Sequence, residues 1–141
     1  MRTTFTRRLV RHVAPVLLVG VSLVSGPAAA AEGPEYSGTY SACMDKAAGV
    51  TASMVECIGV ELQRQDRRLN AAYGQLLETL TPQRRRQLQS VQRLWLQYRD
   101  ANCRFQADPN GGTIARVAGS ACHLEMTTDR ASELERLMPQ R

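Results

Sequence analysis

The segment Gln92–Cys103 reads QRLWLQYRDANC and contains the side chains best suited to chemistry. It holds the chain's single Trp, a Tyr three residues later, an adjacent Arg–Asp pair and a cysteine. Such a set could form a catalytic group, a box for a ligand, or the inner face of a helix. Which of these it is depends on the other reactive groups and on the elements that position them.

The sequence has few residues that could complete a catalytic group. Nucleophilic hydrolysis needs a Ser or Cys beside an oriented base, and the one His after the N-terminal segment, His123, directly follows a cysteine. Asp66 and Asp100 could form a glycosidase pair, but they lie 34 residues apart without a predicted cleft, which favours ion pairing. Gly111-Gly112 lacks the lysine and spacing of a phosphate loop. We therefore predict that the chain is not an enzyme and uses no cofactor.

Residues 1–31 have the three parts of a secretory signal peptide. Four arginines precede an apolar run, Val13–Val24, and a string of small residues follows. The run is too short to span a membrane as a helix, which needs roughly 20 apolar residues. We expect cleavage after Ala30 or Ala31, by either the Sec or the twin-arginine route. The mature domain, residues 32–141, is then expected in the periplasm or outside the cell, without a membrane span.

Removing this segment changes the net charge. The full chain carries 18 Lys and Arg against 13 Asp and Glu, a formal charge of +5. Four arginines and no acidic residue precede residue 32, which leaves 14 basic against 13 acidic residues and a charge of +1. Because its positive and negative charges nearly cancel, the mature domain gives no electrostatic reason to expect nucleic acid as a partner.

The sequence has four cysteines, all in the mature domain. They are Cys43, Cys57, Cys103 and Cys122. An even number in a small exported domain favours disulfides. The mature domain has no CxxC pair and a single histidine, which argues against a metal site. Three pairings are possible, and the spacing favours Cys43–Cys57 with Cys103–Cys122.

Apolar residues recur at helical spacing over two long stretches. The first stripe follows a capping pattern at Ser53–Glu56 and comprises Val55, Ile58, Leu62, Leu69, Tyr73, Leu76 and Leu80. Thr81-Pro82 then predicts a new helix start, and the second stripe comprises Leu88, Val91, Trp95, Tyr98, Asn102 and Phe105. Because almost no loop joins the stripes, we predict an all-α fold built on an antiparallel helical hairpin.

The segments around this hairpin are predicted to be short. Residues 32–40 contain Gly and Pro and are typical of a loose lead-in. Asp108–Gly112 ends the second helix, and Thr127 can cap a last short helix with Leu134 and Leu137 facing inward. The expected domain is therefore a hairpin with short flanking helices, stapled by two disulfides.

Asp66 interrupts the first stripe, between Leu62 and Leu69. In a hairpin that turns at residues 80–81, it lies level with residues 95–99. A buried carboxylate without a partner costs several kcal/mol, so we expect Arg99 to pair with Asp66. On this interpretation, QRLWLQYRDANC supplies one side of a structural seam between the two helices of the hairpin. The predicted seam residues are Asp66, Leu69, Asn70, Tyr73, Trp95, Tyr98 and Arg99.

The same residues carry a family resemblance that extends from Cys43 onward. In order, the motifs are Cys43, Cys57, Asp66-x-x-Leu69-Asn70-x-x-Tyr73, Gln92-x-x-Trp95-x-x-Tyr98-Arg99-Asp100-x-x-Cys103, Gly111-Gly112-Thr113, Cys122 and Thr127-x-x-Arg130-x-x-x-Leu134. This run resembles the LprI-type lysozyme inhibitor family of small exported bacterial proteins. The resemblance implies an all-helical, disulfide-stapled envelope domain that binds and inhibits a lysozyme-type muramidase and so protects the cell wall.

Two surfaces are candidates for a protein partner. An inhibitor needs a rigid segment that enters or covers the sugar-binding cleft, and the loop Asn110, Gly111, Gly112 and Thr113 lies between Cys103 and Cys122. The alternative is an envelope interaction or immunity protein that binds another secreted toxin or envelope component without catalysis. Its candidate is the run Arg84, Arg85 and Arg86, which would suit anionic groups and bind less tightly as salt increases.

Overall fold

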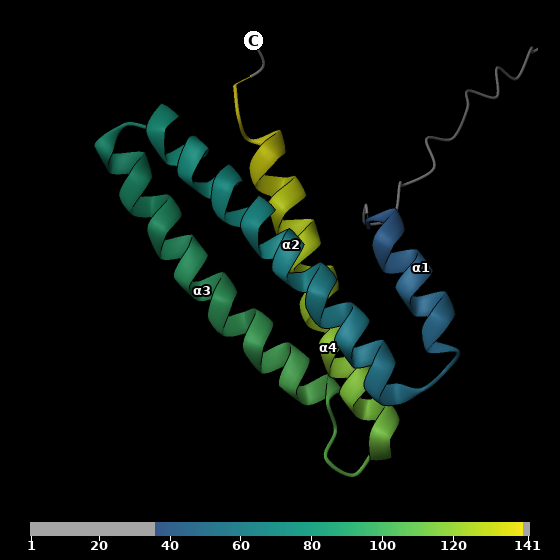
Figure 1. Ribbon diagram of the computed structural model, residues 1–141. Helices are drawn as coiled ribbons and strands as arrows, with labels where there is room; N and C mark the ends of the chain where they lie inside the picture. Colours follow the sequence, from purple (N-terminus) through teal and green to yellow (C-terminus); the bar gives the residue numbers. More distant parts are fainter. Residues whose placement is uncertain (1–35, 140–141) are drawn as a thin grey trace, which may run out of the picture. The chain divides into compact units, whose positions relative to one another are not determined.

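The structure of the protein is a computed structural model that describes residues 36–139 (Figure 1). The predicted signal peptide and its cleavage site lie outside the described residues. Within residues 36–139 the chain forms four helices and no strand. They are α1 (Gly38–Ala47), α2 (Thr51–Thr79), α3 (Pro82–Gln106) and α4 (Gly112–Arg136). None of these helices combines the length and the apolar character needed to cross a membrane.

The first helix begins inside the segment 32–40 that the sequence presents as a lead-in. Ser37 is its N-cap, and the Ser37 hydroxyl accepts a 3.1 Å hydrogen bond from the backbone N–H of Tyr40. The helix ends at Ala48 and Gly49, which have left-handed backbone angles (φ 46° and 83°). This turn brings α1 back against α2, where the Cys43–Cys57 disulfide joins the two helices.

The second helix is 29 residues long and begins earlier than the Ser53–Glu56 pattern predicts. Its N-cap is Val50, which makes no side-chain capping bond, and Ser53 lies within the helix. The buried residues of α2 recur at three- and four-residue steps and include two polar side chains. They are Cys57, Ile58, Glu61, Gln65, Leu69, Ala72 and Leu76.

The turn into α3 follows the sequence prediction. Thr81 is the N-cap and Pro82 the first helical residue, and the Thr81 hydroxyl accepts a hydrogen bond from the Arg84 N–H. Figure 1 shows α2 and α3 running antiparallel from this turn. Direct contact between the two helices is slight, however, because α4 packs against both of them.

The final helix corrects the prediction of a short flanking element. It is 25 residues long, begins at Gly112 and passes through Cys122 without a break. Thr127 is therefore not a cap but a fully buried residue inside α4. Leu134 is buried as expected, whereas Leu137 is 57% exposed. The core lies mainly between α2 and α4, where Leu69, Ala72 and Leu76 pack with Ala131 and Leu134.

This arrangement changes which residues of α3 face inward. Of the predicted second stripe, Val91, Tyr98 and Phe105 are exposed, at 49%, 62% and 84%. The buried residues of α3 are instead Gln92 and Cys103. The reason is that α3 packs against α4 rather than against α2, which rotates the inward face of α3 away from the line that a two-helix hairpin would bury.

Both predicted disulfides are present. Cys43–Cys57 joins α1 to α2, and Cys103–Cys122 joins the end of α3 to the middle of α4. The all-helical class and the cysteine pairing are therefore confirmed.

Candidate functional site

The α3–α4 turn, residues 107–111, is short and internally bonded. The Asp108 carboxylate accepts a 2.8 Å hydrogen bond from the Asn110 backbone N–H, and the Asp108 carbonyl accepts one from Gly111. Gly112 has a φ of 69°, which favours glycine. A Cβ on Gly111 would lie 2.9 Å from the Cβ of Ala115, so this position also requires glycine. The two glycines thus shape the turn, and Asn110 and Thr113 present exposed side chains.

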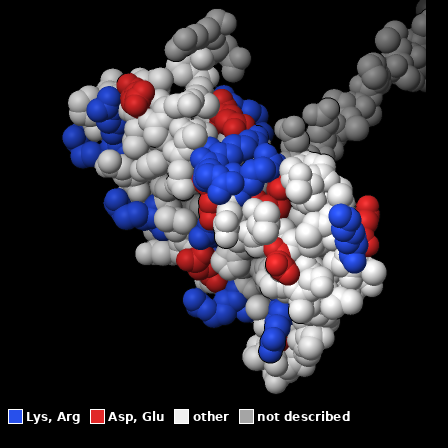
Figure 2. Space-filling model, viewed as in Figure 1, with Lys and Arg blue, Asp and Glu red and all other residues white. Residues whose placement is uncertain are grey.

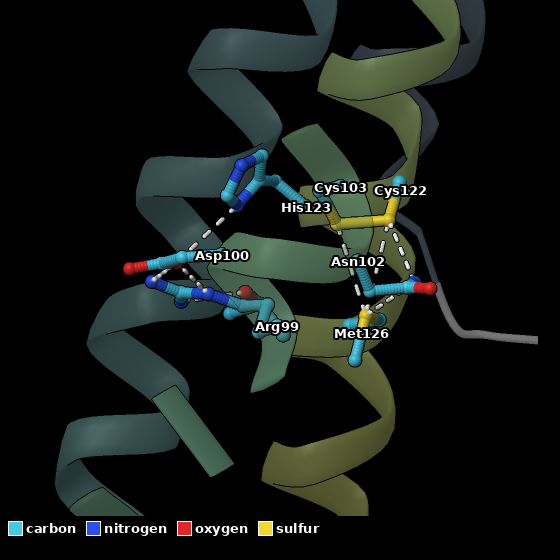
Figure 3. The surroundings of a disulfide bond; sticks show 8 residues. Arg99, Asp100, Asn102, Cys103, Cys122, His123 and Met126 are labelled. Carbon is cyan, nitrogen blue, oxygen red and sulfur yellow. Dashed lines mark hydrogen bonds and ion pairs between the residues drawn. A yellow bond between two sulfur atoms is a disulfide. The ribbon is translucent and has the colours of Figure 1, made fainter. Parts of the chain in front are cut away.

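The base of this turn is held by covalent and close contacts. The Cys103–Cys122 disulfide ties its two helices together, and the sulfur of Met126 lies 3.7 and 3.8 Å from the two disulfide sulfurs. Figure 3 shows the side chain of Asn102 directed at this cluster. Its amide nitrogen lies 3.4 Å from the sulfurs of both Cys122 and Met126. The turn is therefore presented from a fixed base.

A second feature is a groove of about 640 Å³ between α2 and α3. It is open to solvent, and α2 and α3 make little direct contact with each other, since both pack mainly against α4. Its walls combine charged, amide and aromatic side chains. They include Asp66, Leu69, Asn70, Tyr73, Gln92, Trp95 and Arg99, all part of the predicted seam or its motif, together with Gln89, Arg93 and Leu96.

Trp95 lines this α2–α3 groove and lies close to two arginines. The guanidinium carbons of Arg99 and Arg130 lie 5.1 and 5.8 Å from the Trp95 ring centre, within the range of cation–π attraction. Arg130 is buried and donates from Nε to Gln92 Oε1 at 3.0 Å. A second Arg130 nitrogen, NH1, pairs with Glu133 at 2.7 Å, whereas NH2 has no partner within residues 36–139.

The expected ion pair between Asp66 and Arg99 is present, but it is the longer of the two ion pairs that Arg99 makes with carboxylates. Arg99 NH1 lies 3.9 Å from Asp66, while Arg99 Nε and NH2 both lie 3.0 Å from Asp100. Asp100 also lies 4.0 Å from His123 Nδ1, as seen in Figure 3. The Asp66 side chain is 48% exposed. Asp66 is therefore a wall residue of the groove rather than a buried charge.

The remaining predicted seam residues divide between core and surface. Leu69 is buried in the core, and Tyr73 and Trp95 pack against the same cluster while also lining the groove. Asn70 is exposed at the groove, and Tyr98 points away from it, with 62% of its surface exposed. The structure thus brings together most of the seam but places Tyr98 elsewhere.

The three arginines at the start of α3, Arg84, Arg85 and Arg86, make different contacts. Arg85 donates to the carbonyls of Leu80 and Glu78 at 3.0 and 3.4 Å, and so caps the end of α2. Arg84 bonds to Gln87, and Arg86 makes no hydrogen bond or ion pair in the described part of the chain. Figure 2 shows blue and red atoms interspersed on the visible face, with the largest blue patch over the middle of α2.

A buried carboxylate at the α1–α2 contact was not anticipated from the sequence. Glu61 is 2% exposed and accepts hydrogen bonds from the Ser37 hydroxyl (2.6 Å), Arg64 (2.6 Å) and Gln65 (3.1 Å). Burial alone would raise the pKa of Glu61, but the bonds from Arg64, Ser37 and Gln65 outweigh it and lower the pKa to about 2. The cluster holds the start of α1 against α2 and is structural.

Two arginines near Trp95 were also missed as site residues: Arg93, which lines the groove, and Arg130, which lies beside the Trp95 ring. The signal for Arg130 was present in the motif Thr127-x-x-Arg130-x-x-x-Leu134, since an arginine on the inner face of a helix implies a polar partner across the core. Arg93 gave no such signal, because an exposed arginine on a helix is ordinary.

A scan against protein families matches the model described as "Lysozyme inhibitor LprI" over residues 43–134. The chain belongs to the LprI family. A protein of Rhizobium meliloti (strain 1021), described as uncharacterized, is 34% identical over 71 residues. That match covers 50% of this chain and 45% of the relative, so the chain spans less than half of the relative's length. No solved structure matches the chain.

The family match begins at Cys43 and ends at Leu134, and so contains both disulfides, the turn and the groove. For this LprI-family chain, the matched region is the all-helical domain itself.

Proposed function

We propose that this LprI-family chain is an exported protein that binds and inhibits a lysozyme-type muramidase, without catalysis of its own. Membership of a family described as lysozyme inhibitors supports the activity. The observation that carries the site is the α3–α4 turn, whose exposed Asn110 and Thr113 are presented by a short, internally bonded segment. A rigid segment loses little conformational entropy when it enters a cleft, which favours tight binding.

The chemistry of the turn also suits a lysozyme cleft. Catalytic carboxylates line that cleft, and an entering carboxylate would be repelled by them. Asp108 is the acidic residue of the turn, and its side chain is engaged with the Asn110 backbone. The Asn110 amide and the Thr113 hydroxyl are left as hydrogen-bond donors at the exposed edge.

The test is clearance of peptidoglycan by several lysozyme classes in the presence of oxidised mature protein. We expect stoichiometric inhibition that persists at physiological salt and is lost in the double variant Asn110→Ala/Thr113→Ala. The matched control is Gln63→Ala/Gln75→Ala, two exposed polar positions on α2, which should inhibit like the unaltered protein. No inhibition of any class at micromolar protein, or full inhibition by the turn variant, would contradict this function or its site.

A second function is favoured by Arg86, which is exposed and unpaired in residues 36–139. With Arg84 it could bind anionic groups of another secreted toxin or envelope component, while Arg85 is engaged in the α2–α3 turn. Binding by these arginines should weaken sharply as salt is raised and should be reduced in Arg84→Gln/Arg86→Gln. Inhibition through the turn should show neither effect.

A further inference from the structure

The α2–α3 groove has the composition of a ligand site rather than of a packing defect. Its volume of about 640 Å³ lies within the range of roughly 300–1,000 Å³ that is usual for small-molecule pockets. Packing defects in a helical core are lined by apolar side chains, whereas this groove is lined by two arginines, an aspartate and three amides.

One of the two arginines that line the groove has no partner in the described part of the chain. Arg93 makes no hydrogen bond or ion pair within residues 36–139, although it lines the groove. Arg99 is engaged by Asp100 at 3.0 Å, by Thr127 at 3.3 Å and, more distantly, by Asp66 at 3.9 Å. Arg93 is therefore the cation of the groove that is left for a ligand.

The remaining wall residues restrict the ligand further. Gln92 Oε1 is taken by Arg130, which leaves the Gln92 amide nitrogen as a donor at the groove. The Asp66 carboxylate, half exposed and 3.9 Å from Arg99, can accept hydrogen bonds from a ligand. A simple anion such as phosphate would be repelled by Asp66. A ligand with a carboxylate at one end and amide or hydroxyl donors at the other would satisfy both walls.

We propose that the groove between α2 and α3 binds a small carboxylate ligand rich in amide groups, of the kind found in peptidoglycan fragments. Arg93 holds the carboxylate, and Asp66 accepts hydrogen bonds from the amide or hydroxyl groups. This site goes beyond lysozyme inhibition and does not depend on it, because the groove and the α3–α4 turn are formed by different residues.

The position of Trp95 gives a direct measurement. It is the single Trp of the chain and lines the groove, so its emission reports what binds there. The probes are N-acetylmuramyl-L-alanyl-D-isoglutamine, its free dipeptide, and N,N′-diacetylchitobiose, which has amides but no carboxylate. We expect saturable changes in emission with the muramyl dipeptide and none with diacetylchitobiose. If the free dipeptide binds as tightly as the muramyl dipeptide, the groove recognises the peptide alone. If it binds more weakly, the groove recognises the sugar as well. Either result supports the site.

Substitutions separate recognition from folding. Arg93→Gln removes an exposed charge and should weaken binding about tenfold or more, the loss expected for a charge-assisted hydrogen bond. Asp66→Asn should weaken it as well. Arg136→Gln, an exposed arginine at the end of α4, is the matched control and should bind normally. Asn110→Ala/Thr113→Ala should also bind normally, so failure of inhibition and failure of this site remain distinguishable. No saturable change at millimolar probe, equal binding of diacetylchitobiose, or normal binding by Arg93→Gln would overturn the proposal.

Discussion

Gly119 of α4 lies directly against Ala107 at the end of α3. A Cβ built on Gly119 would approach the Ala107 Cβ to 2.6 Å and the Cys103 carbonyl oxygen to 3.3 Å. The two helices meet this closely because one of them has no side chain at the contact. The Cys103–Cys122 disulfide lies beside this contact, and together they fix the base of the α3–α4 turn.

Substitution of Gly119 by alanine should therefore destabilise the domain by about 1–3 kcal/mol, through overpacking of the helix contact. The control is Gly74→Ala in α2, where the new Cβ meets nothing within 4 Å. That change should stabilise the domain by about 0.5–1 kcal/mol, because alanine is the better helix former. Denaturant unfolding of the oxidised proteins measures both, and a Gly119→Ala variant as stable as Gly74→Ala would contradict the close contact.

Acid should weaken the attachment of α1 through Glu61. The folded-state pKa of Glu61 is lowered from 4.5 to about 2, so the folded state holds fewer protons than the unfolded state between these values. The stabilisation is complete above pH 4.5 and is lost as the pH falls towards 2, a change of about 3 kcal/mol in unfolding free energy. Glu61→Gln should remove this part of the pH dependence. An unchanged acid profile in that variant would show that Glu61 is not ionised in the folded protein.

The ion pairs of Arg99 should differ in strength. A double-mutant cycle between Arg99 and Asp100 should give a coupling of up to about 1 kcal/mol, because two guanidinium nitrogens lie 3.0 Å from the carboxylate. The corresponding cycle with Asp66, at 3.9 Å, should give less than about 0.5 kcal/mol. Thermal or urea unfolding of the single and double variants provides both values. The reverse order would mean that Asp66 is the principal partner of Arg99.

Two aromatic residues of α3, Trp95 and Phe105, should differ in how much they contribute to stability. Trp95 packs against the core cluster that contains Leu69 and Leu134, so Trp95→Ala should cost about 2–4 kcal/mol. Phe105 is 84% exposed, and Phe105→Ala should change stability by no more than about 0.5 kcal/mol. Comparable losses in the two variants would indicate that Phe105 is covered in solution.

Periodicity and capping chemistry were sufficient to place two of the helices. Apolar residues at three- and four-residue steps predicted α2, and the Thr81-Pro82 pair predicted the start of α3 to the residue. The disulfide pairing followed from spacing, since each pair closes a short segment, with sequence separations of 14 and 19. Each of these features depends on residues close together in the chain.

The full length of the fourth helix escaped prediction because its inner face is only partly apolar. The buried positions of α4 include Gly119, Thr127, Thr128 and Arg130, which interrupt any hydrophobic stripe. Periodicity also reports which residues of a helix are apolar and not which helix covers them. Because α3 packs against α4 rather than against α2, its inner face differs from that of a two-helix hairpin, and Tyr98 and Phe105 are exposed. The groove is a product of this arrangement and could not be derived from either helix alone.

The length and position of α4 also determine the order in which the chain can fold. The buried partners of α2 come largely from the last quarter of the sequence, at Leu124, Ala131 and Leu134. A chain that emerges with its N-terminus first can form α2 and α3 locally and can pack α1 against α2. The face of α2 that contains Leu69, Ala72 and Leu76, however, lacks its partners Ala131 and Leu134 until α4 has emerged. Contacts between segments so far apart close late, because the loop entropy of the intervening chain must first be overcome. The core can therefore be completed only after the whole domain, including α4, has emerged.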